Sequence, residues 1–425
     1  MSGMHNKSKI VMTSLLLSFG LSAAALASEP LATTNDENYD TLKSEINELR
    51  DQIAIMQELL KQQSIVLQNK VEPEVSKAEI KKLKKDVKKV AKLAKSAEEW
   101  KNTNSTVHLA GYASVGFSKQ AGANGSFSQA QFSPIFHYQY KDKVLLESEL
   151  ELKILPDGST SVGMEYLTID LILNDYMALI AGKFISPLGQ FRQNIHPSWI
   201  NKLPSAPVGF GHDQAAPVAD TGIQLRGAIP MGDSDMRANY AVYVSNGPEL
   251  IPEGSEIEEI ATEGVARDQD GKKVYGGRVG FNPIAKMEIG LSVASGQAAI
   301  ALESARSYNV LGADFAYQWE KLDLRGEYVQ QKVGALSSSV APESWKWSSW
   351  YMQGAYKLPN NFEAVARYSD YDSPHASQDQ RQLAIGLNYL FAPQVITKIS
   401  YEFNDGLAGT SAAANRIRAQ IAYGF

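Results

Sequence analysis

Basic residues recur in the C-terminal three-quarters of the chain, most of them singly, within segments in which polar and apolar residues alternate. An arginine guanidinium keeps its charge and pairs with a carboxylate or phosphate through two hydrogen bonds. If these segments are strands, alternate residues share one face, and that face attracts anions. The residues concerned are Arg226, Arg237, Arg278, Arg325, Arg367, Lys398, Arg416 and Arg418. The alternative is that they pair with acids on the same face, such as Asp323, Glu327 and Glu402.

Carboxylates occupy the same kind of position earlier in the chain. Glu147, Glu149 and Glu151 alternate with leucine and serine, and Asp170 follows in the next apolar segment. Acidic and basic sectors on opposite sides of an enclosed space would set an electric field across it. We therefore expect a polar lumen with one acidic and one basic side.

Further polar residues lie in or beside a Pro-rich segment at 185–220. They are Lys183, Arg192, His196, Lys202, His212 and Asp213. His196 and His212 could ligate a metal ion, but neither has clustered partners in the sequence. We therefore expect no metal site and no cofactor. No histidine of this region lies in a nucleophile motif, so we expect no enzymatic activity and no catalytic residue.

The elements that would position these residues are strands. From about residue 106 the apolar pattern has a period of 2, which is typical of strands. Most segments approach the roughly 9–11 residues that cross a bilayer as a tilted strand. The sixteen predicted strands are 106–117, 128–140, 144–153, 161–172, 176–184, 221–229, 235–245, 273–281, 287–295, 308–318, 322–332, 345–356, 362–369, 380–390, 395–404 and 414–425.

The connectors between these strands alternate between tight turns and longer loops, as in membrane barrels. The last strand ends on the aromatic residue Phe425, and the chain contains no cysteine. We predict an all-β transmembrane barrel of 16 antiparallel strands at 101–425, located in the bacterial outer membrane. A soluble two-layer sandwich is the alternative, but the alternating loop lengths argue against it.

The N-terminal region has a different character. Residues 1–27 combine a basic start, an apolar run over 10–21 and small residues at 25–27, which predicts a secretory signal peptide. Residues 28–41 form a polar linker. After residue 27 the chain has no stretch of 18 apolar residues, so the sequence offers no transmembrane helix.

Residues 42–100 predict an α-helical coiled coil in the periplasm. A heptad seam needs a partner helix, and the simplest partner is the same segment of another copy. The seam residues are Leu42, Ile46, Leu49, Ile53, Met56, Leu60, Gln63 and Leu67. The lysine-rich segment Lys77–Lys95 could contact cell-wall polymers, or it is simply a solvated face. It lacks interleaved aromatic residues, so we expect no nucleic-acid binding.

Two segments carry a family resemblance. Residues 181–189 read AGKFISPLG, and residues 220–227, after a long loop, read DTGIQLRG. This pattern resembles the phosphate-selective (O/P-type) porin family. With its N-terminal coiled coil the chain looks like the dicarboxylate-channel branch of trimeric porins. The resemblance implies a homotrimer of sixteen-stranded barrels in which the third loop, 185–220, folds inward and narrows the pore.

The function expected from these patterns is passive diffusion of small solutes through a water-filled channel. We expect a preference for small anions, phosphate or small carboxylates. The expected partners are other copies of the chain, outer-membrane lipid and lipopolysaccharide. The alternative is a structural tether that links the outer membrane to the cell wall through the coiled coil.

Overall fold

The computed structural model describes residues 105–425 except 233–235 and 264–266. These residues belong to one compact unit, Lys101–Phe425. The predicted signal peptide, linker and coiled coil, with the seam residues and Lys77–Lys95, lie outside the described residues. Among the described residues, no helix combines the length and apolar character needed to cross a membrane.

Almost all regular structure in the described part of the chain is β-strand. The strands are β1 (Ser105–Gln120), β2 (Ser126–Tyr140), β3 (Val144–Ile154), β4 (Thr160–Asn174), β5 (Met177–Ile185), β6 (Ala219–Pro230), β7 (Arg237–Ser245), β8 (Glu249–Glu253), β9 (Glu256–Ala261), β10 (Val274–Ile284), β11 (Met287–Ile300), β12 (Arg306–Trp319), β13 (Leu322–Val333), β14 (Trp345–Lys357), β15 (Phe362–Asp372), β16 (Gln380–Ala392), β17 (Val395–Gly406) and β18 (Arg416–Gly424).

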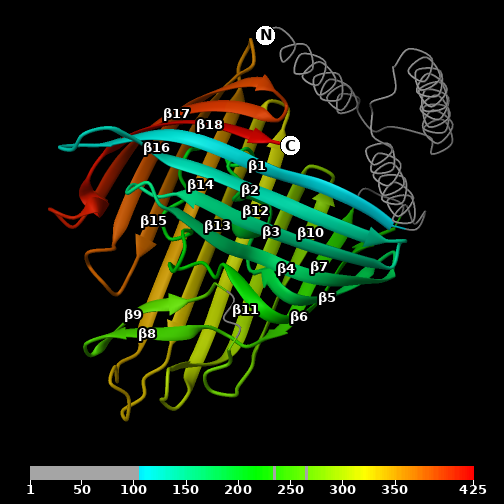
Figure 1. Ribbon diagram of the computed structural model, residues 1–425, viewed down its shortest axis with the longest axis vertical. Coiled ribbons are helices and arrows are strands. Elements are labelled where there is room, and N and C mark those ends of the chain that lie inside the picture. The colour runs from blue at the N-terminus through cyan, green and yellow to red at the C-terminus, as the bar shows by residue number, and fades with distance from the viewer. Residues whose placement is uncertain (1–104, 233–235, 264–266) are drawn as a thin grey trace, which may run out of the picture. The chain divides into compact units, whose positions relative to one another are not determined.

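Sixteen of these strands form a closed ring (Figure 1). Each wall strand pairs antiparallel with its neighbours in the chain, and β7 pairs with β10. The ring closes because β1 pairs with β2 on one edge and with β18 on the other. At the seam the backbone N–H groups of Gly111 and Phe425 each donate to the other's carbonyl at 2.9 Å. The predicted barrel of 16 antiparallel strands is therefore confirmed.

The two remaining strands, β8 and β9, form a hairpin within the loop between β7 and β10. β8 also pairs in parallel with the end of β11 through Ala299 and Ile300. The hairpin reaches the loop between β15 and β16, where the His375 ring bonds the carbonyl of Ile257 at 2.8 Å. The sequence analysis predicted no strand between 245 and 273, so this hairpin had no counterpart there.

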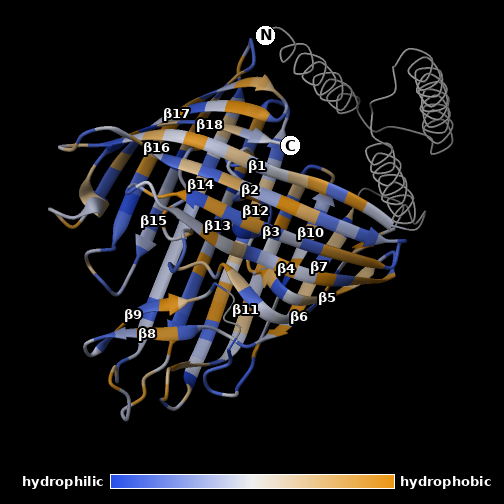
Figure 2. Ribbon diagram, in the orientation of Figure 1, coloured by the Kyte–Doolittle hydropathy of each residue, from blue (hydrophilic) through white to orange (hydrophobic). Residues whose placement is uncertain are grey.

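The wall presents apolar residues outward and polar residues inward, and Figure 2 shows the alternation along the strands. In β16, Leu383, Ile385 and Leu387 are exposed on the outer face, whereas Gln382 and Asn388 are buried inside. A closed ring with an apolar exterior satisfies every backbone group of the wall within the sheet, which is the requirement for crossing a bilayer. The chain is an outer-membrane β-barrel.

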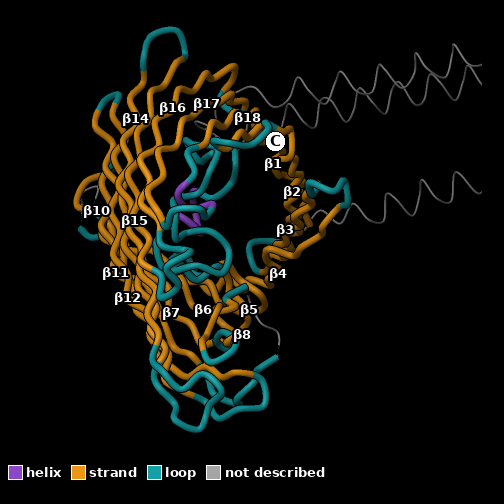
Figure 3. The backbone as a smooth tube through the Cα atoms, turned by 90° about the vertical axis from the view of Figure 1, so that its left-hand side faces the viewer, coloured by secondary structure: helices purple, strands orange, loops and turns teal. Residues whose placement is uncertain are grey.

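The segment between β5 and β6, residues 186–218, lies within the ring of strands (Figure 3). It contains a short π-helix, Phe191–Ile195. Its apolar residues Leu188, Phe191 and Phe210 are buried together with Tyr351 of β14. We call this segment the inner loop.

Gly111 gives a test of barrel closure. A methyl group at this residue would lie 2.5 Å from the Ser133 carbonyl oxygen and 2.8 Å from the Phe425 ring. We expect Gly111→Ala to destabilise the barrel by about 1–3 kcal/mol, as overpacking does. The measurement is the temperature at which the folded form is lost in semi-native electrophoresis. The matched control is Gly163→Ala on β4, where nothing lies within 4 Å. Equal stability of both variants would contradict the prediction.

Candidate pore constriction

Two buried cations hold the inner loop against the wall. Lys398 of β17 donates to the carbonyl oxygens of Ser198 at 2.5 Å and Asn201 at 2.8 Å. Arg367 of β15 donates to the carbonyl oxygens of Ser205 and Ala206, both at 2.9 Å. Backbone carbonyls are the natural partners of such donors, because burial leaves no water to pair with either group.

The sequence analysis placed Lys398 and Arg367 on the open wall of the lumen. Both side chains are instead 1% exposed, because the inner loop covers them. Both cations donate to backbone carbonyls of the inner loop, so they hold this loop in position and are shielded from the open lumen.

A buried carboxylate binds the inner loop near the point where the loop enters the lumen. Glu327 of β13 accepts hydrogen bonds from the backbone N–H groups of Gln190 at 3.1 Å and Phe191 at 2.9 Å. Gly189 just before them has φ +94°, and a Cβ there would lie 1.8 Å from Glu327 Oε1. Only glycine allows the chain to turn this close to the carboxylate.

Three other arginines of the predicted set form ion pairs with acidic residues of the wall strands. Arg278 bonds Asp314 at 2.6 Å and Glu288 at 2.9 Å. Arg325 bonds Asp323 at 2.7 Å, and Arg418 bonds Glu402 at 2.9 Å. The structure thus supports the alternative of wall-pairing for these three arginines. Glu327, the third acid named in that alternative, binds the inner loop instead.

The acidic side of the lumen lies on β3 and β4. Glu149 accepts a hydrogen bond from the Tyr112 hydroxyl at 2.7 Å. Arg226 of β6 reaches Asp170 at 3.2 Å and approaches Glu147 at 4.0 Å. Arg226 therefore stands at the edge of the acidic sector rather than opposite to it.

Two cavities meet beside Arg226. One, of about 290 Å³, is lined by Glu147, Glu149 and Tyr166. The other, of about 410 Å³, is lined by Asn239 and Arg278 among others. Arg226 and Gln193 of the inner loop line both. The Arg226 guanidinium therefore lies where the two cavities adjoin.

The remaining basic residues of the predicted set lie at other levels of the wall. Arg237 is exposed at the start of β7. Arg416 donates to the carbonyl of Ser411 at 3.0 Å. Lys183 shares the outward face of the wall with Leu167, its register partner, and donates to the carbonyl of Met164 at 2.6 Å. Lys183 was expected at the constriction, but the alternation of β5 turns it away from the lumen.

The other predicted loop residues are in the lumen. Lys202 pairs with Glu363 at 3.1 Å. Arg192 and His196 are buried, and burial lowers the pKa of the Arg192 guanidinium and lowers the pKa of His196 to about 3. His196 is therefore neutral. His212 bonds Glu263 through Nδ1, and burial raises the pKa of Asp213 beside it.

The sequence analysis missed Glu165 of β4, which faces the lumen beside Glu151. Strict alternation back from Leu167 and Ile169, both exposed outside, would place Glu165 in the membrane. A register shift between β3 and β4 lies at this point: Glu149 faces Tyr166, and Leu150 faces Met164. Glu165 is the extra residue of a β-bulge, and a bulge inverts the alternation that follows. The sequence did contain a sign of this bulge: strict alternation would place one charged residue, Glu165, among the lipid-facing residues of β4.

The contact between Lys398 and the inner loop gives a second test. Lys398→Met removes the donor to two loop carbonyls, so we expect the loop to loosen, the single-channel conductance to rise and the barrel to remain folded. Planar-bilayer recordings measure this. Arg325→Met is the control, because its partner Asp323 lies on the same strand and does not touch the loop. Unchanged conductance in Lys398→Met would count against the anchoring role.

Comparison with known proteins gives structural likeness only. No protein-family profile matches the chain, and no curated sequence matches it. Among solved structures, the anion-selective porin from Comamonas acidovorans is 15% identical with a TM-score of 0.52. The alignment covers 76% of this chain and 100% of that porin.

A second similar structure is the Salmonella typhi OmpF complex with daunomycin, which is 11% identical with a TM-score of 0.51. It covers 76% of this chain and 99% of OmpF. At these identities the likeness establishes the fold. Together with the closed ring and its apolar exterior, it shows that the described residues have the sixteen-stranded fold of outer-membrane porins.

Proposed function

We propose that this barrel is a passive channel for small solutes with a preference for anions such as phosphate or small carboxylates. The observation that carries the proposal is an asymmetry within the ion pairs of the lumen. In several of them the cation is more exposed than its carboxylate partner. A solute in the lumen therefore meets guanidinium and ammonium groups first.

The clearest example is Arg226, whose side chain is 42% exposed while that of Asp170 is 4% exposed. Lys202 is 22% exposed against 2% for Glu363. Arg418 with Glu402 and Lys153 with Glu151 follow the same order. Other pairs run the other way. Asp323 is slightly more exposed than Arg325, and Glu288 is more exposed than Arg278. Glu303 is more exposed than Arg306, and Glu263 is slightly more exposed than His212.

The exposed partner dominates because it is nearer to the solute and less shielded by the wall. Charges act over about 8 Å at physiological salt, which suits a space narrowed by the inner loop. The formal net charge of −6 does not oppose this, because a pore responds to its own lining and not to the whole chain. The Comamonas porin is anion-selective by its own description; the proposal for this chain rests on its own lumen.

Selectivity is tested by reversal potentials in a salt gradient. A unit charge about 4 Å from a passing ion contributes about 1 kcal/mol in water. Arg226→Gln should therefore lower the chloride-to-potassium permeability ratio several-fold. Arg381→Gln is the matched control, because Arg381 shares the outward face of β16 with Leu383 and pairs with Asp370. Cation selectivity of the native protein at low salt would refute the anion preference.

We also propose that the channel is a homotrimer held partly by the heptad seam at 42–69. The seam pattern supports association, and the porin resemblance supports three copies. Native mass measurement of the detergent-solubilised protein should give trimers. A variant lacking 28–100 should keep a folded barrel with weaker association. Monomers or dimers of the full chain would reject the trimer. If no ion conductance were found in a planar bilayer, the tether would become the better hypothesis.

A further inference from the structure

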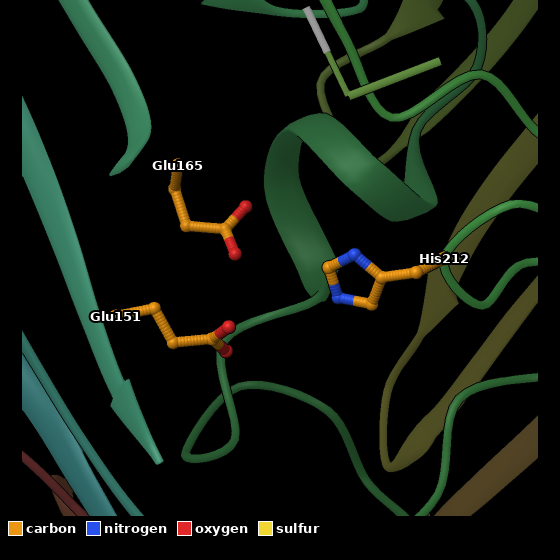
Figure 4. A group of neighbouring side chains, drawn as sticks. All are labelled: Glu151, Glu165 and His212. Carbon is orange, nitrogen blue, oxygen red and sulfur yellow. The ribbon is translucent and has the colours of Figure 1, made fainter. Parts of the chain in front are cut away.

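Three potential metal ligands from three segments converge in the lumen (Figure 4). They are Glu151 of β3, Glu165 of β4 and His212 of the inner loop, and their ligand atoms all lie within 4.8 Å of one another. Two carboxylates and one imidazole form a donor set of the kind that binds divalent metal ions in proteins.

The wall supplies the two carboxylates through different means. Glu151 faces inward by the normal alternation of β3, whereas Glu165 faces inward because it is the bulge residue of β4. A regular strand would have left only Glu151 in this part of the lumen. Bulges often re-aim a side chain at a functional site.

The imidazole is already oriented for coordination. Its Nδ1 is held by Glu263, which follows the β8–β9 hairpin, and Nε2 remains available on the other side of the ring. Figure 4 shows the ring of His212 facing both carboxylates. Metal-binding histidines typically have a carboxylate on the second nitrogen, which fixes the tautomer and the ring orientation.

Glu151 already accepts hydrogen bonds from Lys153 at 2.5 Å and from the Gln131 amide at 2.7 Å, one on each oxygen. Each carboxylate oxygen has a second lone pair that a metal ion can use. Arg192 is more than nine-tenths buried in the adjacent π-helix and interacts electrostatically with Glu165 and Glu151. Its Nε and Nη2 nevertheless have no hydrogen-bond partner. These two donors of the guanidinium therefore do not engage the carboxylate of Glu165.

We propose that Glu151, Glu165 and His212 bind one divalent ion of the zinc class. The imidazole favours zinc over calcium or magnesium, which prefer all-oxygen sites. Bonds of about 2.0–2.2 Å require the ligands to draw together from their present separation. His212 lies on a loop, so it can make this adjustment. The sequence analysis found no clustered partners for His212. Its partners lie on strands about 50–60 residues earlier in the chain, so only the fold brings them together.

Such a site would fasten the inner loop to the opposite wall. The loop's other polar contacts described above go to β13, β15 and β17. A metal at this point would join it to β3 and β4 and neutralise two wall carboxylates. Zinc should therefore raise the anion preference of the channel.

Zinc binding to the detergent-solubilised full chain, measured by titration calorimetry, tests the site directly. We expect one zinc ion per chain. His212→Ala and Glu165→Gln should each weaken binding at least tenfold. Glu263→Gln should weaken it by about 10- to 100-fold, as loss of a supporting carboxylate does. Glu147→Gln is the matched control, since it removes a lumen carboxylate from the same face of β3, outside the site, and should keep native zinc affinity.

The proposal is overturned if native protein does not bind zinc, or if His212→Ala and Glu165→Gln bind it as tightly as the native chain. The second result would place zinc elsewhere, for example at the neighbouring His108 and His137. Calorimetry does not depend on conduction. If zinc binds as expected but the protein carries no ionic current, the channel proposal fails while the metal site stands.

Discussion

The structure depends on one constraint: every backbone N–H and C=O of a wall that faces lipid must find its partner within the wall. The ladder between β1 and β18 meets this constraint, because it removes the two free edges of the sheet. It explains why the terminal residue of the chain is bonded to Gly111. A glycine is needed there because a Cβ would clash with the Ser133 carbonyl oxygen of β2 and with the Phe425 ring.

The closed ring of strands also determines which side chains face the interior. A ring of sixteen strands encloses more space than wall side chains can fill, and alternate residues of every strand face that space. The charged residues among them must be hydrated, paired or covered. The inner loop covers Lys398, Arg367 and Glu327, and its backbone carbonyls and N–H groups become their partners. The same interactions that satisfy buried charges therefore fix the position of the constriction, and removing one side chain should affect the loop before the barrel.

Alternation made the wall predictable from sequence. The strand predicted at 380–390 is observed at Gln380–Ala392, and the one at 322–332 is Leu322–Val333. The rule works because lipid imposes a period of 2 on every strand. It fails where that period is interrupted, as at the bulge that turns Glu165 inward. It also gives no information on what covers an inward residue, so it could not separate the buried Arg367 from the exposed Arg226. The β8–β9 hairpin was not predicted because its many glutamates are typical of an exposed loop. In the structure its apolar residues Leu250, Ile257 and Ile260 pack into the buried cluster.

The charge of the lumen shows why counting residues is a poor guide to selectivity. Arg226, Arg278, Arg325 and Arg418 each have a carboxylate within bonding distance, so much of the positive charge of the wall is balanced locally. In the proposed channel, the potential that acts on a solute depends on which charges lie nearer to the centre of the lumen. Long side chains such as lysine and arginine extend past the shorter acids with which they pair, and the carboxylates stay against the wall. In the pairs of Arg226, Lys202 and Arg418 the positive group is therefore the more exposed partner. At the junction of Glu151 and Glu165 with His212, two carboxylates face the inner loop, and Lys153 pairs with Glu151 there. A cation bound at that junction would balance the second carboxylate and reduce the negative charge that faces the loop.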